Sequence, residues 1–150
     1  MTSSVVLVTG GFDPIHSGHI SLLNSAKQIA PLSALAVGLN SDHWLTRKKG
    51  KPFMPFYDRL MVVRALKMVD NVLEFDDSND TACDAIAQCL EIYDKVIFCN
   101  GGDRHNENTP EFNLYKDDSR VIYRWGVGGT GKKQSSSWLL EEWDNRDKSS

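Results

Sequence analysis

Short apolar runs alternate with segments of helical period along this chain, and that order constrains the fold more than any other feature. Residues 4–9 read SVVLVT and residues 32–39 read LSALAVGL, and both look like short buried strands. Strands that alternate with helices predict a parallel sheet joined by right-handed crossovers. The expected strands are Ser4–Thr9, Leu32–Leu39, Asn71–Phe75, Lys95–Cys99 and Arg120–Tyr123, and the expected helices are Ser17–Ile29, Tyr57–Met68, Asp80–Ile92 and Ser135–Trp143.

Four polar or glycine-rich loops are expected where the predicted strands end. In a parallel sheet these loops share one rim, and open α/β sheets bind their ligands beyond the carboxyl ends of the strands. Four such loops on one rim are more than a scaffold needs, so the sequence predicts the ligand site there. The loops are Gly10–His19, Asn40–Lys51, Asn100–Glu111 and Gly126–Ser137, and Arg47–Pro55 is expected to continue the second as a basic loop.

The first loop carries two histidines three residues apart, in the stretch GGFDPIHSGH. Gly10 and Gly11 allow a tight turn and a close approach of the backbone to a ligand. Their amides and the N-terminus of the following helix form an anion site. His16 and His19 lie at the start of that helix, and an imidazole N–H donates to a phosphate oxygen in either charge state. The pattern therefore indicates a phosphate site.

Two other interpretations of these loops are not favoured. A zinc site needs a third and usually a fourth ligand; His43 and His105 are candidates, but no cysteine has suitable spacing, so no metal site is expected. Gly126–Lys132 reads GVGGTGK, which satisfies part of the P-loop pattern. Lys133 stands where a P-loop needs a Ser or Thr hydroxyl for magnesium, so kinase or NTPase activity through this loop is not expected.

The composition is that of an ordinary globular chain. The 150 residues are the usual size of one domain and no linker divides them, so residues 1–150 are expected to form a single domain with a frayed tail at 144–150. The net charge of −3 argues against a nucleic-acid partner. No apolar run is long enough to span a membrane, and no signal peptide is apparent. The three scattered cysteines indicate reduced thiols and a cytoplasmic location.

The stretch GGFDPIHSGH resembles the GxFDxxHxGH signature of the nucleotidyltransferases related to cytidylyltransferases, a Rossmann-like superfamily. GLNSD, RKKGKP, DRLMVVRAL, VDNVLEF and NGGD then follow in an order that resembles the adenylyltransferase domain that makes ADP-heptose and glycerol-3-phosphate cytidylyltransferase. The likeness covers about residues 4–140. It implies a Rossmann-like parallel five-stranded sheet with helices on both faces. It also implies transfer of a nucleoside monophosphate from CTP or ATP to a sugar or polyol phosphate, with release of pyrophosphate.

The candidate site residues suit that chemistry. A phosphate monoester is already anionic near neutral pH, because its second pKa is ~6, so the enzyme must supply alignment and charge neutralisation rather than a strong base. Magnesium is expected to enter with the triphosphate. The expected catalytic residues are His16, His19, Arg47 and Lys48; the expected nucleotide-binding residues are Gly10, Gly11, Phe12, Asp13, Gly18, Lys132, Lys133, Ser135, Ser136 and Ser137; the expected acceptor-binding residues are Asp42, Lys49, Arg59, Asp103 and Arg104. For the run RKKGK, a solvated basic loop is the alternative.

One segment departs from the resembled pattern. The family's C-terminal signature is Ile-Ser-[Ser/Thr]-Thr-x-x-[Arg/Lys], but Gln134–Leu140 reads QSSSWLL, so Leu140 stands where a cation is expected. Lys132 and Lys133 are expected to supply that charge from the preceding loop. Because of this departure, a nucleotide-binding domain without catalytic turnover stays an alternative hypothesis. The enzymatic alternative is the same fold with pantetheine phosphate or nicotinamide mononucleotide as acceptor. The expected partners are a nucleoside triphosphate and a phosphorylated small molecule, without nucleic acid or membrane, and the resemblance also allows a homodimer.

Overall fold

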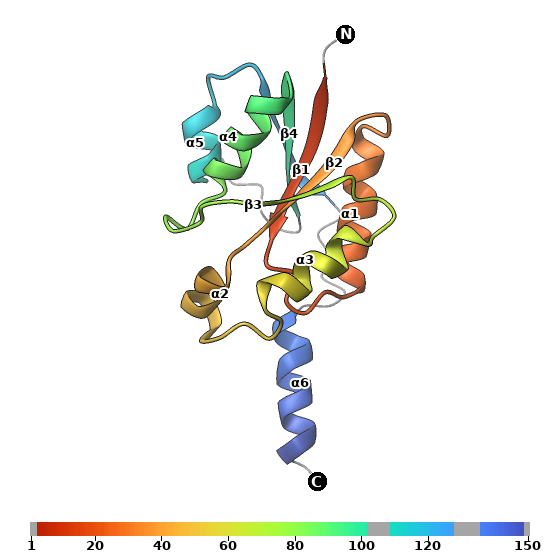
Figure 1. Ribbon diagram of the computed structural model, residues 1–150, viewed down its shortest axis with the longest axis vertical. Coiled ribbons are helices and arrows are strands. Elements are labelled where there is room, and N and C mark those ends of the chain that lie inside the picture. Colours follow the sequence, from red (N-terminus) through yellow and green to blue (C-terminus); the bar gives the residue numbers. More distant parts are fainter. Residues whose placement is uncertain (1–2, 102–108, 128–135, 149–150) are drawn as a thin grey trace.

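Five parallel strands form a single sheet with helices on both faces (Figure 1). The structure, a computed structural model, describes residues 3–101, 109–127 and 136–148. The strands lie in the order β3-β2-β1-β4-β5, and every neighbouring pair is parallel. This confirms the predicted fold class. The strands are β1 (Ser4–Gly10), β2 (Ala34–Leu39), β3 (Asn71–Glu74), β4 (Lys95–Gly101) and β5 (Val121–Val127).

The strand order places a topological switch point beside β1. The chain moves outward from β1 through β2 to β3, and then crosses back so that β4 pairs with the other edge of β1. In open α/β sheets, the crevice beyond the carboxyl ends of the strands at such a point is where ligands bind. We call the carboxyl ends of the five strands, with the loops that follow them, the carboxyl rim. It lies at the lower end of the sheet in Figure 1.

Two apolar layers hold the helices on the sheet. On one face, α1 (Ser17–Ile29) and α3 (Phe56–Arg64) cover strand residues such as Val6 and Val37. On the other face, α4 (Cys83–Ile92) and α5 (Pro110–Tyr115) lie together, and α4 covers residues such as Val5 and Phe98. The strands are apolar on both faces because both faces are covered, which is typical of parallel sheets.

Several element bounds differ from those predicted, and local backbone chemistry accounts for the differences. Residues 42–49 form a helix, α2 (Asp42–Lys49), where the basic part was expected to be loop, because Ser41 caps its start. Gly50 ends that helix with a positive φ of 92°. Helix α4 starts at Cys83 rather than Asp80, which has a φ of 60° that no right-handed helix accepts. The short α5 was missed, although Thr109 caps it and Pro110 is its first residue.

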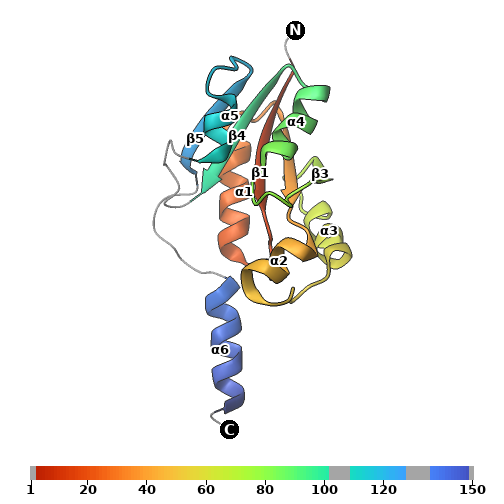
Figure 2. The ribbon, with the colours of Figure 1, turned by 90° about the vertical axis from the view of Figure 1, so that its left-hand side faces the viewer.

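The C-terminal segment also differs from the prediction. Helix α6 (Ser136–Lys148) continues through most of the tail that was expected to be frayed. No glycine or proline interrupts residues 136–148, so nothing in the sequence ends the helix earlier. Figure 2 shows α6 starting below the carboxyl rim and running away from the sheet. None of the helices in the described parts of the chain is long and apolar enough to cross a membrane.

Candidate nucleotidyltransferase site

The turn between β1 and α1 needs its two glycines for packing. A Cβ on Gly11 would lie 3.0 Å from Leu45 Cδ2 and 3.6 Å from the Trp44 ring, both on α2. A Cβ on Gly10 would lie 3.1 Å from the ring of Phe12, which is buried and has a φ of 51°. Sequence reasoning explained these glycines by the approach of a ligand. In the structure their missing side chains let Phe12 fold under the turn and let α2 approach it closely.

The two histidines form a capping box at the first turn of α1. His16 is the N-cap residue, and its Nδ1 accepts a hydrogen bond from the Gly18 amide at 3.0 Å. His19 stands three residues later, and its Nδ1 accepts a hydrogen bond from the His16 amide at 3.1 Å. A ring nitrogen that accepts a hydrogen bond carries no proton, so Nε2 is the nitrogen with which each ring can donate. The backbone thus assigns the accepting role to Nδ1 and the donating role to Nε2 in both rings.

Burial keeps His19 uncharged. Its ring centroid lies 4.0 Å from that of His16 and 4.6 Å from that of Phe12. Burial, together with the neighbouring His16, lowers the pKa of His19 from 6.5 to about 4. At neutral pH, His19 is therefore a neutral imidazole with a proton on Nε2. Such a group donates a hydrogen bond to an anion without carrying a charge of its own, and it lies at the N-terminal, partly positive end of α1.

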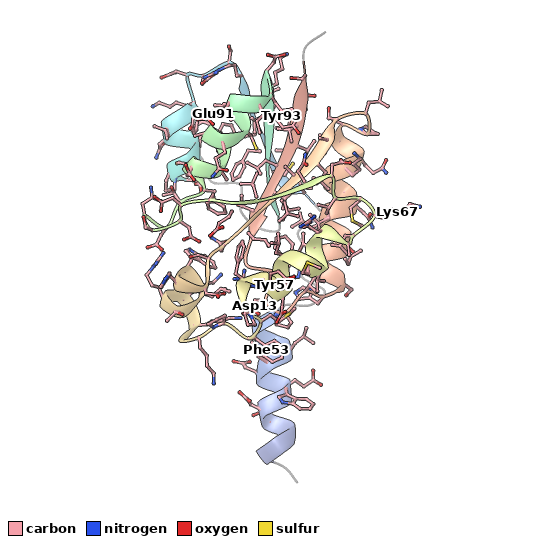
Figure 3. All side chains as sticks on the ribbon, viewed as in Figure 1. Asp13, Phe53, Tyr57, Lys67, Glu91 and Tyr93 are labelled. Atoms are coloured by element: carbon pink, nitrogen blue, oxygen red, sulfur yellow. The ribbon has the colours of Figure 1, made fainter. Side chains whose placement is uncertain are left out.

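Asp13 joins the histidine turn to the loop between α2 and α3. Its carboxylate is buried and accepts hydrogen bonds from the backbone amides of Phe53 at 2.7 Å and Met54 at 2.5 Å. Lys49 Nζ lies 2.8 Å from the same carboxylate and also donates to the Asp13 carbonyl at 2.7 Å. Figure 3 shows Asp13 and Phe53 together at the carboxyl rim. These contacts hold the loop between α2 and α3 in place. Asp13 and Lys49 were both expected to bind ligand, and in this structure they are paired with each other.

The three consecutive cations of α2 have different surroundings. The Arg47 guanidinium donates to the Asp80 carboxylate at 3.0 Å and to the Asp77 carbonyl at 2.8 Å. Lys49 is paired with Asp13, as described above. The Lys48 ammonium lies 4.7 Å from the centroid of the Trp44 ring, a cation–π contact. Arg47 and Lys49 therefore fasten α2 to two neighbouring loops, and Lys48 lies between these two fastening points.

Arg59 is a buried centre that ties three parts of the rim together. Its side chain is fully buried, and the guanidinium donates to the carbonyls of Met54, Gly11 and Asn40 at 2.9, 2.9 and 2.7 Å. It also donates to Asp42 at 2.8 Å, and the other oxygen of Asp42 accepts from the Phe56 amide at 3.2 Å. Arg59 and Asp42 were expected to bind the acceptor. In this structure their hydrogen bonds hold the rim.

The structure thus gathers most of the predicted site residues at one rim. Gly18, which was expected to bind nucleotide, is the residue whose amide His16 caps. Asp103, Arg104, Lys132, Lys133 and Ser135 lie outside the described residues, and the side chains of Ser136 and Ser137, at the start of α6, lie outside them too. In residues 3–101, 109–127 and 136–148, no group of three His, Cys, Asp or Glu side chains could hold a metal ion.

Asp77 is a residue of this rim that sequence reasoning missed. Its buried carboxylate accepts hydrogen bonds from Ser41 and Asn40, which follow β2. Ser41 carried a usable signal, because a serine just before a charged helical segment is a typical N-cap. Asp77 carried none, because its partners lie 36 and 37 residues away in the sequence.

Comparison with known proteins agrees with this geometry. Residues 7–105 match the sequence profile of the family described as cytidylyltransferase-like. The chain belongs to the cytidylyltransferase-like family. Its membership confirms the resemblance predicted from GGFDPIHSGH and, with it, the nucleotidyltransferase class.

Curated relatives support the same family, and a solved structure shows the same fold. This cytidylyltransferase-like chain is 35% identical over 116 residues to bifunctional protein HldE of Streptomyces coelicolor, and 43% identical over 106 residues to that of Blochmanniella floridana. These matches cover 76% and 69% of the chain, but only 23% and 20% of the relatives' length. A putative nicotinate-nucleotide adenylyltransferase from Vibrio parahaemolyticus shares the fold, with a TM-score of 0.62 at 15% identity over 93% of this chain and 85% of that one.

Proposed function

We propose that this chain transfers a nucleoside monophosphate from CTP or ATP to the phosphate group of a sugar or polyol phosphate. An oxygen of the acceptor phosphate forms a bond to the α-phosphorus of the triphosphate. The bond from the α-phosphorus to the oxygen that bridges to the β-phosphate breaks, and pyrophosphate leaves. Family membership and the resemblance of GGFDPIHSGH, GLNSD and NGGD to sugar-phosphate and polyol-phosphate enzymes support this choice of reaction and acceptor.

The observation that carries the proposal is the histidine pair at the start of α1. Both rings use Nδ1 to accept hydrogen bonds from backbone amides, so Nε2 is the donating nitrogen of each ring. Both stand at a helix N-terminus at the switch point of the sheet, where anions bind. Donors that are fixed before the reaction stabilise the charge that develops as pyrophosphate leaves, and they do so without reorganising.

Among the cations of α2, we assign the role of phosphate clamp to Lys48. Its ammonium lies over the Trp44 ring, and that ring lies against Gly11 in the turn that leads to the two histidines. A lysine is a compact point charge on a long flexible stem, so it can reach a phosphate oxygen bound at this turn. The clamp would neutralise the α-phosphate and align the acceptor phosphate with it.

Magnesium would enter as part of the nucleoside triphosphate complex. The carboxylate beside the histidine turn, Asp13, is already bonded to two amides and Lys49, so it is not placed to hold a metal ion as well. Magnesium keeps several waters and is commonly held by phosphate oxygens, which suits a site of this kind. When bound, the ion would neutralise charge on the phosphates. The residues of this chain would then align the phosphates and donate hydrogen bonds to them.

We propose a cytoplasmic location for the enzyme. Cys83, Cys89 and Cys99 are all free thiols. Burial raises the pKa of Cys89 to about 11 and that of Cys99 to about 12, so both stay protonated and unreactive at neutral pH. Free thiols that persist in this way are typical of a reducing compartment.

Pyrophosphate release with a matrix of substrates tests the proposed reaction. CTP and ATP would each be combined with glycerol 3-phosphate, a set of sugar phosphates, pantetheine phosphate and nicotinamide mononucleotide. The proposal predicts release that needs one sugar or polyol phosphate, with a product equal in mass to that acceptor plus the nucleoside monophosphate. Pyrophosphate release only with pantetheine phosphate or nicotinamide mononucleotide would show that one of these is the acceptor, in place of a sugar or polyol phosphate. Tight triphosphate binding without release in any combination would favour a binding domain without turnover.

A further inference from the structure

Helix α2 carries the proposed clamp but is too short to hold its own position. It has eight residues, from Asp42 to Lys49, and isolated helices below ~12–15 residues are marginal in water. Only Leu45 of its side chains is buried. Its direction must therefore be fixed by contacts at its ends. Lys49, bonded to Asp13, fixes the C-terminal end, as described above.

Asp77 fixes the other end from the loop between β3 and α4. Its Oδ2 accepts the Ser41 amide at 2.7 Å and the Asn40 side-chain amide at 3.1 Å, and its Oδ1 accepts the Ser41 hydroxyl at 2.7 Å. The Ser41 hydroxyl has one proton, and it is given to Asp77. Its lone pairs stay available for the Trp44 amide, which donates to it at 3.0 Å as the N-cap bond of α2.

The same residue also contacts the far end of the helix through its backbone. The Asp77 carbonyl accepts a hydrogen bond from Arg47 at 2.8 Å, almost two turns after Ser41. Asp77 is 4% exposed, so its carboxylate lies where a hydrogen bond is strong and an unpaired donor is costly. A negative charge at this position also complements the N-terminal end of the α2 dipole.

We propose that Asp77 is the positioning residue that sets the direction of α2 and thereby places Lys48 for phosphate transfer; this rests on the proposed function. An eight-residue helix is about 12 Å long, so a shift of about 2 Å at the Ser41 end turns the helix, and with it the Lys48 side chain, by roughly 10°. A misplacement of about 1 Å in a site that works by alignment can lower the rate on the order of 100-fold. Asp77 therefore acts on the reaction through Lys48, without touching a substrate.

The variant Asp77→Asn tests this inference, with Asp76→Asn as its matched control. Asparagine replaces one acceptor oxygen by a donor, which then faces the Ser41 and Asn40 donors. Asp76 lies in the same loop and loses the same charge, but its carboxylate accepts only from Ser78. We expect D77N to lower kcat at least 10-fold with a smaller change in the KM for the triphosphate, and D76N to stay near wild type. If D77N does not fold, Ser41→Ala is used in its place. It removes only the bridging hydroxyl, and we expect a smaller loss of kcat of the same kind.

A double-mutant cycle with Lys48→Ala separates positioning from general stability. If Asp77 acts through Lys48, D77N lowers kcat far less in a K48A background than in the wild type, and hydrogen exchange of the 42–49 segment rises while that of α1 does not. An equal loss of kcat in both backgrounds, or unchanged exchange in α2, would overturn the inference and leave the proposed function standing. Wild-type turnover in K48A alone would remove the proposed clamp, and the role of Asp77 with it.

Discussion

The low pKa of His19 makes the stability of the fold depend on pH in a defined window. The folded protein holds this ring neutral down to about pH 4, whereas the unfolded chain protonates it near pH 6.5. Between those values the unfolded state binds more protons, so the contribution to stability is fully present above pH 6.5 and is lost as the pH falls toward 4. The two pKa values give a loss of about 2 kcal/mol at pH 5, which approaches a limit of about 3 to 4 kcal/mol below pH 4.

The variant His19→Gln isolates this effect. Glutamine does not titrate, and a glutamine at this third helical position can still accept the N-cap amide in a capping box. Urea unfolding of wild type and H19Q at pH 7 and pH 5 gives the free energy of unfolding for each. We expect the wild type to lose about 2 kcal/mol more than H19Q between these two values. His43→Gln removes an exposed imidazole on α2 and serves as the matched control. Equal losses in wild type and H19Q would show that His19 is not held neutral by the fold.

The remaining predictions concern the histidines, the packing of the rim and the metal. His16→Ala and His19→Ala should each lower kcat about 100- to 1,000-fold while leaving circular dichroism unchanged, because each removes one fixed donor; near wild-type rates in both would refute their role. Gly11→Ala should destabilise the fold by about 1–3 kcal/mol in urea unfolding, since the new Cβ would press on Leu45, and full stability would contradict the tight packing of α2. Arg59→Met should lower the free energy of unfolding by about 3 kcal/mol or more, because Asp42 and three carbonyls lose their donor, and a stability equal to wild type would count against Arg59 as the centre of the rim. Exhaustive chelation followed by adding back single metals should restore turnover with magnesium and not with zinc; full activity without any metal would contradict the magnesium requirement.

Periodicity and turn chemistry were enough to predict the sheet, but not the contacts between its loops. The strands were predictable because runs such as SVVLVT leave no helical alternative, and the parallel order follows from the alternation. The position of the histidines was predictable because the motif sits at a strand-to-helix junction. Their use of Nδ1 for capping was not, because it depends on backbone directions that spacing alone does not give.

The assignment of cations and carboxylates to roles depended on tertiary pairing. Arg59 and Lys49 were predicted to bind the acceptor, and the structure places one among backbone carbonyls and pairs the other with Asp13. Charge alone did not predict these contacts. Asp77 illustrates the same limit, since no local pattern marks a buried aspartate that binds the N-cap residue of a helix 36 residues earlier. Long-range polar pairing is therefore what the structure adds to the sequence.

Parallel reactions with α-labelled and γ-labelled triphosphate test the central claim most directly. The wild-type protein would be incubated with magnesium, the labelled triphosphate and the acceptor that supports pyrophosphate release, and the products separated by chromatography. Nucleotidyl transfer predicts that the α-label appears on the acceptor and the γ-label appears in pyrophosphate, with both signals strongly reduced in H16A. Transfer of the γ-label to the acceptor, or its appearance only as inorganic phosphate, would contradict the account and indicate a kinase or a hydrolase instead.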